Sequence, residues 1–419
     1  MDGPSRPDAD AADLPLSQKA LEGRPRGVFV DSSGSPPLPR PAATPENKPG
    51  KRAQGGSWWW AAAPLGIATL LTVLARFQPQ RIEELYSRKL YPKIGALLQA
   101  CNRQWIELSG ATNGDLSTRR PSLSEALLGV ALGVLLVALI RAGFRGFGAF
   151  TRRVLWIGGA GYFAFLLVWG LNHSRMPLSS TLDLDVTEVS AEELNEVALE
   201  LERDLSQLLR KEDVRGASTG ALADPLAGPP IGPEALDAWS AALRRDPQLG
   251  WQSEPTLCAP ALSSSLITAG ISGIFSPFSQ EAHVPFGLPE TDLAFAACHE
   301  IAHVQGWARE DEANYLAWRV GSRSDSLVLR KAALTLALVH VHRALRQANP
   351  ILQKQRILDM DVRVLTLLEA RSTFWSKNRS RLASRAVQTV NDTYLKSQGQ
   401  EHGVASYGRM VDLLVAELR

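Results

Sequence analysis

The chain has 419 residues, of which 45% are hydrophobic and 21% are charged, and its formal net charge at pH 7 is +2. This small charge, with no basic stripe that carries interleaved aromatic residues, argues against a nucleic-acid partner. The three cysteines, Cys101, Cys258 and Cys298, have neither the spacing of a metal site nor that of a disulfide framework.

Residues 1–56 are predicted to form a disordered N-terminal segment. They are rich in Pro, Gly, Ser, Asp and Arg, and Phe29 is their single aromatic residue. A segment so poor in large apolar side chains cannot bury a core. We therefore expect ordered structure to begin near residue 57.

Residues 57–172 are predicted to be a membrane region with three transmembrane helices. The apolar runs cover about 58–75, 123–140 and 154–171, and each reaches or approaches the length that spans a bilayer. The first opens with three tryptophans, which are typical of a membrane interface, and follows a polar segment, as a signal anchor would. For any one run the alternative is a buried core helix. The short Arg-rich loop between the second and third runs favours a pair of spans.

The distribution of lysine and arginine predicts the orientation of these spans. Basic residues precede the first span and crowd the loop between the second and third: Lys48, Lys51, Arg52, Arg141, Arg145, Arg152 and Arg153. The positive-inside rule places both segments in the cytoplasm. Arg76, Arg119 and Arg120 abut the opposite ends of the spans and count against this orientation. It would place residues 173–419 outside the cytoplasm.

Residues 173–419 are predicted to form a soluble, largely helical domain. Ser190 and Glu193 have the spacing of a capping box ahead of an amphipathic helix. Residues 266–278 are apolar but interrupted by glycine and proline, which favours a strand or buried loop; a strand there could pair with an extended peptide. Residues 327–345 predict another helix. The expected fold class is mainly α, with a small sheet or edge strand beside the helices.

The most specific motif is His299-Glu300-Ile301-Ala302-His303. Residues four apart share one face of a helix, so both imidazoles can bind one Zn²⁺ while Glu300 points at a water molecule on that metal. We expect Asp292 to cap this helix and Gly306 to end it. The alternative is an exposed amphipathic helix whose histidines and glutamate meet solvent.

A catalytic zinc needs three protein ligands and one open position, so an acidic cluster soon after the motif is informative. Glu310 shares a helical face with two alanines and Asn314, and small residues would let this helix approach the first one. We predict Glu310 as the third ligand and Glu312 as the runner-up. Asn314, one turn on, is the expected hydrogen-bond partner of a ligating histidine.

These residue types predict hydrolysis with one Zn²⁺ per chain. Zinc would lower the pKa of a bound water molecule and Glu300 would accept its proton, with a peptide bond as the favoured electrophile. Tyr394, His402 and Tyr407 are candidate donors to the oxyanion by residue type alone. A structural role is the favoured alternative for each of them.

Several segments carry a resemblance to a known family. They are residues 84–88, 90–92, 169–175, 270–278, the motif at 299–303 with the acidic segment after it, 391–396 and 406–409. From the first span to the C-terminus the chain resembles a bacterial membrane family described as domain of unknown function 3810. Residues 172–174 and 280–283 depart from the family's pattern.

This resemblance implies a multi-pass protein of the bacterial cytoplasmic (inner) membrane with a zincin-like site. The acidic segment is also similar to the glutamate-bearing helix of other zincins, in which the first Glu of Glu-x-x-Ala-Asn binds the metal. That similarity favours Glu310 over Glu312.

Two classes of function remain open. The first is a membrane-anchored zinc peptidase acting on protein or peptide substrates; the second is a non-catalytic membrane assembly or binding protein with a structural zinc. Glu300 favours the peptidase, because a structural site has no need of a general base. A transporter is disfavoured, since the spans contain no cluster of ionisable residues. The sequence does not indicate an oligomeric state.

Overall fold

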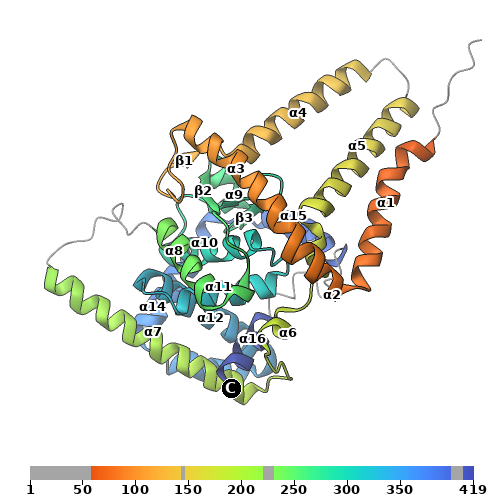
Figure 1. Ribbon diagram of the computed structural model, residues 1–419. Coiled ribbons are helices and arrows are strands. Elements are labelled where there is room, and N and C mark those ends of the chain that lie inside the picture. Colours follow the sequence, from red (N-terminus) through yellow and green to blue (C-terminus); the bar gives the residue numbers. More distant parts are fainter. Residues whose placement is uncertain (1–57, 143–146, 220–230, 398–408) are drawn as a thin grey trace, which may run out of the picture. The chain divides into compact units, whose positions relative to one another are not determined.

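The computed structural model describes residues 58–142, 147–219, 231–397 and 409–419 (Figure 1). The disordered segment predicted at 1–56 lies outside these residues. The described chain is mainly helical with one small sheet, as predicted. Up to residue 182 its elements are α1 (Trp58–Arg76), α2 (Pro79–Arg81), the π-helix η1 (Ile82–Leu90), α3 (Tyr91–Ser109), β1 (Arg119–Arg120), α4 (Leu123–Ala142), α5 (Phe147–Val168), the 3₁₀ helix η2 (Gly170–Ser174) and α6 (Leu178–Leu182).

The remaining elements build the part of the chain that holds the HExxH motif. They are α7 (Ala191–Thr219), α8 (Ile231–Arg245), the 3₁₀ helix η3 (Pro247–Leu249), β2 (Thr256–Pro260), α9 (Ser263–Ala269), β3 (Ile274–Ser276), β4 (Glu281–His283), α10 (Glu290–Val304), α11 (Glu310–Ser322), α12 (Leu327–Ala348), α13 (Pro350–Leu358), α14 (Val362–Asn378), α15 (Arg381–Ser397) and α16 (Met410–Leu418). Helices α10, α11 and α12 pack against one another at the centre of the main hydrophobic core (Figure 1).

Helices form at all three predicted spans, but their suitability for a membrane differs. Among the described residues, only α1 is long and apolar enough to cross a bilayer by length and composition. The qualifying apolar stretch of α4 is shorter, Leu123–Ala138. In α5 the charged residues Arg152 and Arg153 fall within the helix and lower its hydropathy. The described residues therefore contain one candidate membrane-spanning helix, α1.

Helix α1 packs closely against α5. A Cβ atom on Gly159 would lie 2.7 Å from the backbone nitrogen of Leu65, so the contact requires a glycine at this position. The Thr72 and Tyr162 hydroxyls are 3.2 Å apart, and the Arg152 guanidinium lies 5.6 Å from the centre of the Trp58 ring. These pairs advance together along both helices, so α1 and α5 run parallel.

The segment from α2 to α3 packs against the helix that carries the HExxH motif, a contact that the sequence did not predict. Tyr86 and Tyr91 are buried in a second core with Trp169, Leu171 and Ala308, the last of which immediately precedes α11. Residues between the first two apolar helices thus support the candidate site directly.

Of the two predicted helix caps, the one at α7 forms and the one at α10 does not. The capping box at α7 is confirmed: Ser190 N donates to Glu193 Oε2 at 2.9 Å, and Glu193 N donates to Ser190 Oγ at 3.1 Å. The prediction that Asp292 caps α10 is wrong, since the helix begins at Glu290 after Pro289. Asp292 instead accepts hydrogen bonds from distant side chains, Arg371 and Trp375 on α14.

The small sheet has the strand order β1-β2-β4-β3. Strand β2 is parallel to β1 and β4, while β3 pairs antiparallel with β4 and forms an edge. Residues 266–278, predicted as a strand or buried loop, divide into the end of α9 and the strand β3. Strand β3 contacts α10, which places this edge beside the HExxH helix.

Candidate metal centre

The packing of α10 on α11 brings His299, His303 and Glu310 together. Each offers a ligand atom, and these atoms lie within 4.8 Å of one another. Glu310 Oε2 is 3.3 Å from His299 Nε2, and its Oε1 is 3.7 Å from His303 Nε2. The carboxylate therefore faces both imidazoles from the neighbouring helix.

The runner-up Glu312 lies away from this cluster. Its Oε1 accepts hydrogen bonds from the backbone N–H of Leu178 and from the Arg309 guanidinium, each at 2.8 Å. Its side chain is 5% exposed, so this carboxylate is buried with these two donors rather than facing the histidines. The geometry distinguishes the two acids, with Glu310 in the cluster and Glu312 anchoring the start of α6.

His303 is held as a neutral imidazole with one nitrogen free. Its Nδ1 is 2.7 Å from the carbonyl oxygen of Trp307, so Nδ1 carries the proton and donates it. Burial lowers the pKa of His303 to about 4, which keeps the ring uncharged at neutral pH. Nε2 therefore presents a lone pair toward Glu310, the arrangement in which histidine binds a metal.

His299 has a different environment. Burial disfavours its charged form, but Glu310 and Glu300 outweigh burial and raise the pKa of the imidazole. Asn314 lies against this ring and acts in the same direction, which fits its predicted position as a neighbour of a ligating histidine.

The turn after α10 is fixed by side chains from distant segments. Tyr91 Oη donates to the carbonyl of Val304 at 2.8 Å, and Trp169 Nε1 donates to that of His303 at 3.2 Å. Arg175 donates to the carbonyl of Gly306 at 3.0 Å and stacks over Trp307. Gly306 has φ +86°, the left-handed conformation expected at the end of the helix. These contacts orient the Trp307 carbonyl that holds His303.

Glu300 lies on the same helix and is 4% exposed. Within the described part of the chain its Oε2 has no hydrogen-bond partner. Burial raises the pKa of this carboxyl group to about 8, and the charge of His299 opposes the shift. A buried carboxyl group with a free oxygen is suited to exchanging a proton with a bound molecule.

Gly273, just before β3, gives Glu300 its space. A Cβ atom at this position would lie 2.2 Å from Glu300 Oε1. We predict that Gly273→Ala displaces the Glu300 side chain and reduces any activity that depends on this carboxyl group, while metal content is unchanged. Activity and metal content of Gly273→Ala should be compared with those of Gly129→Ala, where a Cβ would meet no neighbour within 4 Å. Equal activity in both variants would contradict this role.

Helix α15 brings Tyr394 to the cluster. Its hydroxyl is 2.9 Å from His173 Nε2, and its ring packs edge-on against Phe165. Burial, followed by the nearby charge of Glu310, raises the pKa of Tyr394, so the phenol remains a proton donor. Burial lowers the pKa of His173 to about 3 and keeps that ring neutral. The other two donor candidates, His402 and Tyr407, lie outside the described residues.

The fold and site define a mainly helical protein with a His-His-Glu cluster on two packed helices. The chain belongs to the family described as "Protein of unknown function (DUF3810)", whose model matches residues 86–415. The match begins after α1, so it does not extend over the first predicted span. No curated protein and no solved structure matches the chain.

Proposed function

We propose that the protein is a membrane-anchored, zinc-dependent peptidase. The observation that carries the proposal is the buried carboxyl group of Glu300, whose Oε2 has no hydrogen-bond partner among the described residues, beside the cluster of His299, His303 and Glu310. A site that only ties helices together would have no use for this group. The fold itself supports no particular chemistry, so the proposal depends on the site.

The donor set and its spacing fit a zinc ion. Two imidazole nitrogens and one carboxylate oxygen form a known ligand set of catalytic zinc. Ligands about 2.1 Å from a tetrahedral metal are about 3.4 Å apart. Glu310 lies 3.3 and 3.7 Å from the two Nε2 atoms, distances longer than those of most direct hydrogen bonds.

Each residue then has a definite task. His299, His303 and Glu310 would hold zinc, and Asn314 and the Trp307 carbonyl would orient the two imidazoles. Zinc bound there would lower the pKa of a water molecule and polarise a substrate carbonyl. Glu300 takes the proton of the attacking water and returns it to the leaving amine. Its carboxyl group is buried beside the cluster, which places it to carry the proton from one to the other.

Tyr394 is the proposed donor to the oxyanion, oriented by His173. We predict that Tyr394→Phe lowers kcat about 100-fold to 1,000-fold, the usual effect of losing one such donor, with little change in KM. Steady-state kinetics should compare it with Tyr162→Phe, which removes a hydroxyl whose neighbour is Thr72 on α1. An unchanged kcat in Tyr394→Phe would show that the Tyr394 hydroxyl is structural.

A metal-content measurement tests the ligand assignment. Wild type, His299→Ala, Glu310→Ala and Glu312→Gln should be purified in detergent and analysed by inductively coupled plasma mass spectrometry. Relative to wild type, the first two substitutions should each remove about one equivalent of zinc, since a site with two ligands binds weakly. Glu312→Gln should retain it. Loss in Glu312→Gln with full retention in Glu310→Ala would contradict the assignment.

We further propose that the chain crosses the bacterial inner membrane three times. Most apolar side chains along α4 are exposed, among them Val130, Val134 and Ile140, and a lipid environment would cover them. The parallel packing of α1 and α5 supports this topology, because parallel neighbours require an intervening span. Arg152 lies near Trp58 at the shared starting end of both helices, which favours a cytoplasmic start and an extracytoplasmic domain. Of the other basic residues behind this orientation, Arg153 follows Arg152 on α5 and Arg141 is near the end of α4. Lys48, Lys51, Arg52 and Arg145 lie outside the described residues.

Strand β3 offers a docking edge for an extended protein or peptide substrate. It is the outer strand of the sheet and lies against α10, so a substrate strand added to it would pass near Glu300. This placement favours a peptide over a compact small molecule.

A further inference from the structure

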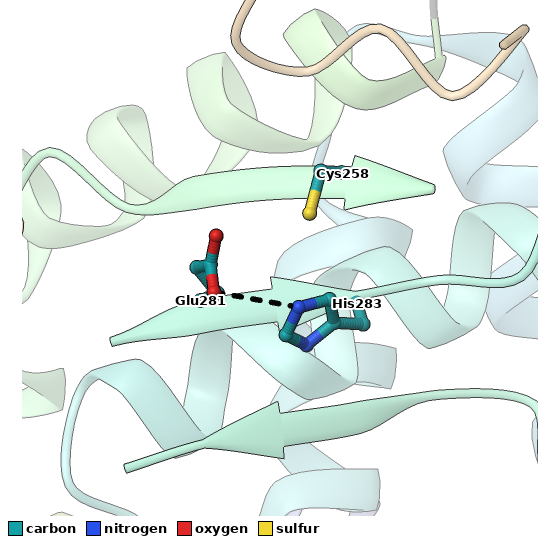
Figure 2. A group of neighbouring side chains, drawn as sticks. All are labelled: Cys258, Glu281 and His283. Carbon is teal, nitrogen blue, oxygen red and sulfur yellow. Dashed lines mark ion pairs between the residues drawn. The ribbon is translucent and has the colours of Figure 1, made fainter. Parts of the chain in front are cut away.

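We propose that Cys258, Glu281 and His283 form a second binding site for a zinc-like divalent cation, separate from the His299 cluster. Their ligand atoms lie within 4.8 Å of one another (Figure 2). Thiolate, imidazole and carboxylate are all zinc ligands. The inference goes beyond the proposed peptidase and does not depend on it.

The sheet itself brings these side chains together. Strands β2 and β4 are parallel neighbours, and their register places Cys258 opposite His283. Glu281 is two residues before His283, so both project from the same face of β4. Figure 2 shows the thiol, the carboxylate and one ring nitrogen turned toward a common space between the strands. Positions far apart in the sequence thus converge through strand pairing.

The imidazole is oriented as a ligand. His283 Nδ1 is 3.1 Å from the carbonyl oxygen of Ile274 on β3, so it donates a hydrogen bond there. Nε2 faces Glu281 Oε2 at 3.6 Å, which is too long for a usual hydrogen bond and close to the separation of two ligands on one zinc ion. Ser124 Oγ lies 3.0 Å from the same nitrogen, and an ion bound there would replace this hydrogen bond. His303 has the same arrangement with the Trp307 carbonyl.

This orientation argues against a thiol nucleophile activated by a histidine and an acid. Such a triad needs the acid on one ring nitrogen and the nucleophile on the other. Here the carbonyl of Ile274 accepts the hydrogen bond of Nδ1, so the acid cannot take that nitrogen. Glu281 instead lies on the side of Nε2, the nitrogen that would have to accept the proton of the Cys258 thiol in a triad. The acid therefore does not hold the imidazole from the side opposite the thiol, as a triad requires, and the three donor atoms instead lie within 4.8 Å of one another, as in a ligand set.

Surrounding contacts position the carboxylate and leave room for an ion. Glu281 accepts hydrogen bonds from the backbone N–H groups of Leu123 and Ser124 at the start of α4, at 2.9 and 2.8 Å. A cavity of about 20 Å³, space for about one water molecule or ion, adjoins two of the three residues: Cys258 and Glu281 line it, and His283 does not. A cation there would tie the sheet to the first turn of α4.

Cobalt binding tests this site without reference to hydrolysis. The full-length protein in detergent, stripped of metal and loaded with Co²⁺ alone, should show near-ultraviolet absorption from thiolate-to-cobalt charge transfer. The His299 cluster has no thiolate, so this band reports only a cysteine ligand. We expect the band in wild type, in His299→Ala and in the control Cys101→Ser, which alters an exposed cysteine. Cys258→Ser should lose the band and about one equivalent of cobalt.

Absence of the band in wild type, or its persistence in Cys258→Ser, would overturn the proposal. Circular dichroism will show whether Cys258→Ser is folded. If it is not, alkylation of wild type decides the question: bound cobalt should protect Cys258 from iodoacetamide and leave the labelling of Cys101 unchanged, as read by peptide mass spectrometry. Equal labelling of Cys258 with and without cobalt would refute the site. The cobalt band and the labelling of Cys258 do not depend on metal at the His299 cluster. The peptidase proposal and the proposal of a second metal site can therefore fail separately.

Discussion

Replacing Glu300 with glutamine is expected to lower kcat/KM for peptide hydrolysis about 100-fold to 10,000-fold, the usual contribution of a general base. Glutamine has nearly the same size and fits the same buried space, but its amide cannot accept a proton. Glu300 is not among the three grouped donors, so zinc content should match that of wild type. The measurement is steady-state kinetics together with metal analysis of the same sample.

Glu290→Gln is the matched control for this substitution. Glu290 lies in the first turn of the same helix, and its half-exposed side chain pairs with Lys331. Its substitution should leave both activity and zinc unchanged. Full activity in Glu300→Gln would rule out a general base at this position. Simultaneous loss of zinc and activity would instead indicate that Glu300 maintains the site.

The second large effect is expected from Arg175→Met, which should destabilise the protein by about 3–5 kcal/mol, as loss of one partner of a buried ion pair does. Arg175 donates two hydrogen bonds of 2.8 Å to Glu83, and their side chains are 4% and 8% exposed. Its removal would leave Glu83 paired only with the half-exposed Arg88. The Gly306 carbonyl and the Trp307 ring would lose the same partner, so zinc affinity should also fall.

Thermal unfolding in detergent should compare this variant with Arg103→Met. Arg103 pairs with Glu254 at 2.9 Å, but both side chains are largely exposed, so its loss should cost less than about 1 kcal/mol. Adding Glu83→Gln to Arg175→Met should recover part of the lost stability, because the buried charge of Glu83, which had lost its buried partner, is then removed. Equal unfolding temperatures for the two arginine variants would contradict the buried-pair account.

The sequence was most informative where the relevant geometry is local. His299 and His303 share a helical face because they are four residues apart, and Glu310 followed from the same periodicity on the next helix. The capping box at Ser190 and the helix end at Gly306 are also local, and the structure contains both. Asp292 failed as a predicted cap because a tertiary contact with Arg371 decided its role.

Features that depend on distant contacts could not be predicted. Tyr91, Trp169 and Arg175 reach the turn after α10 from segments more than a hundred residues earlier, and periodicity carries no signal for such contacts. Cys258 was set aside because it has no metal-ligand spacing in the sequence. Only the register of β2 on β4 places it opposite His283.

The most direct test of the central claim is a peptide-library cleavage assay on the purified full-length protein. Four samples are needed: the zinc-loaded wild type, the same protein after chelation, the chelated protein after zinc return, and zinc-loaded Glu300→Gln. We predict cleavage at defined peptide bonds by wild type, loss of cleavage on chelation with recovery when zinc is returned, and no cleavage above background by Glu300→Gln. A wild-type protein that carries zinc and cleaves nothing, or a Glu300→Gln variant that cleaves as well as wild type, would contradict the peptidase proposal.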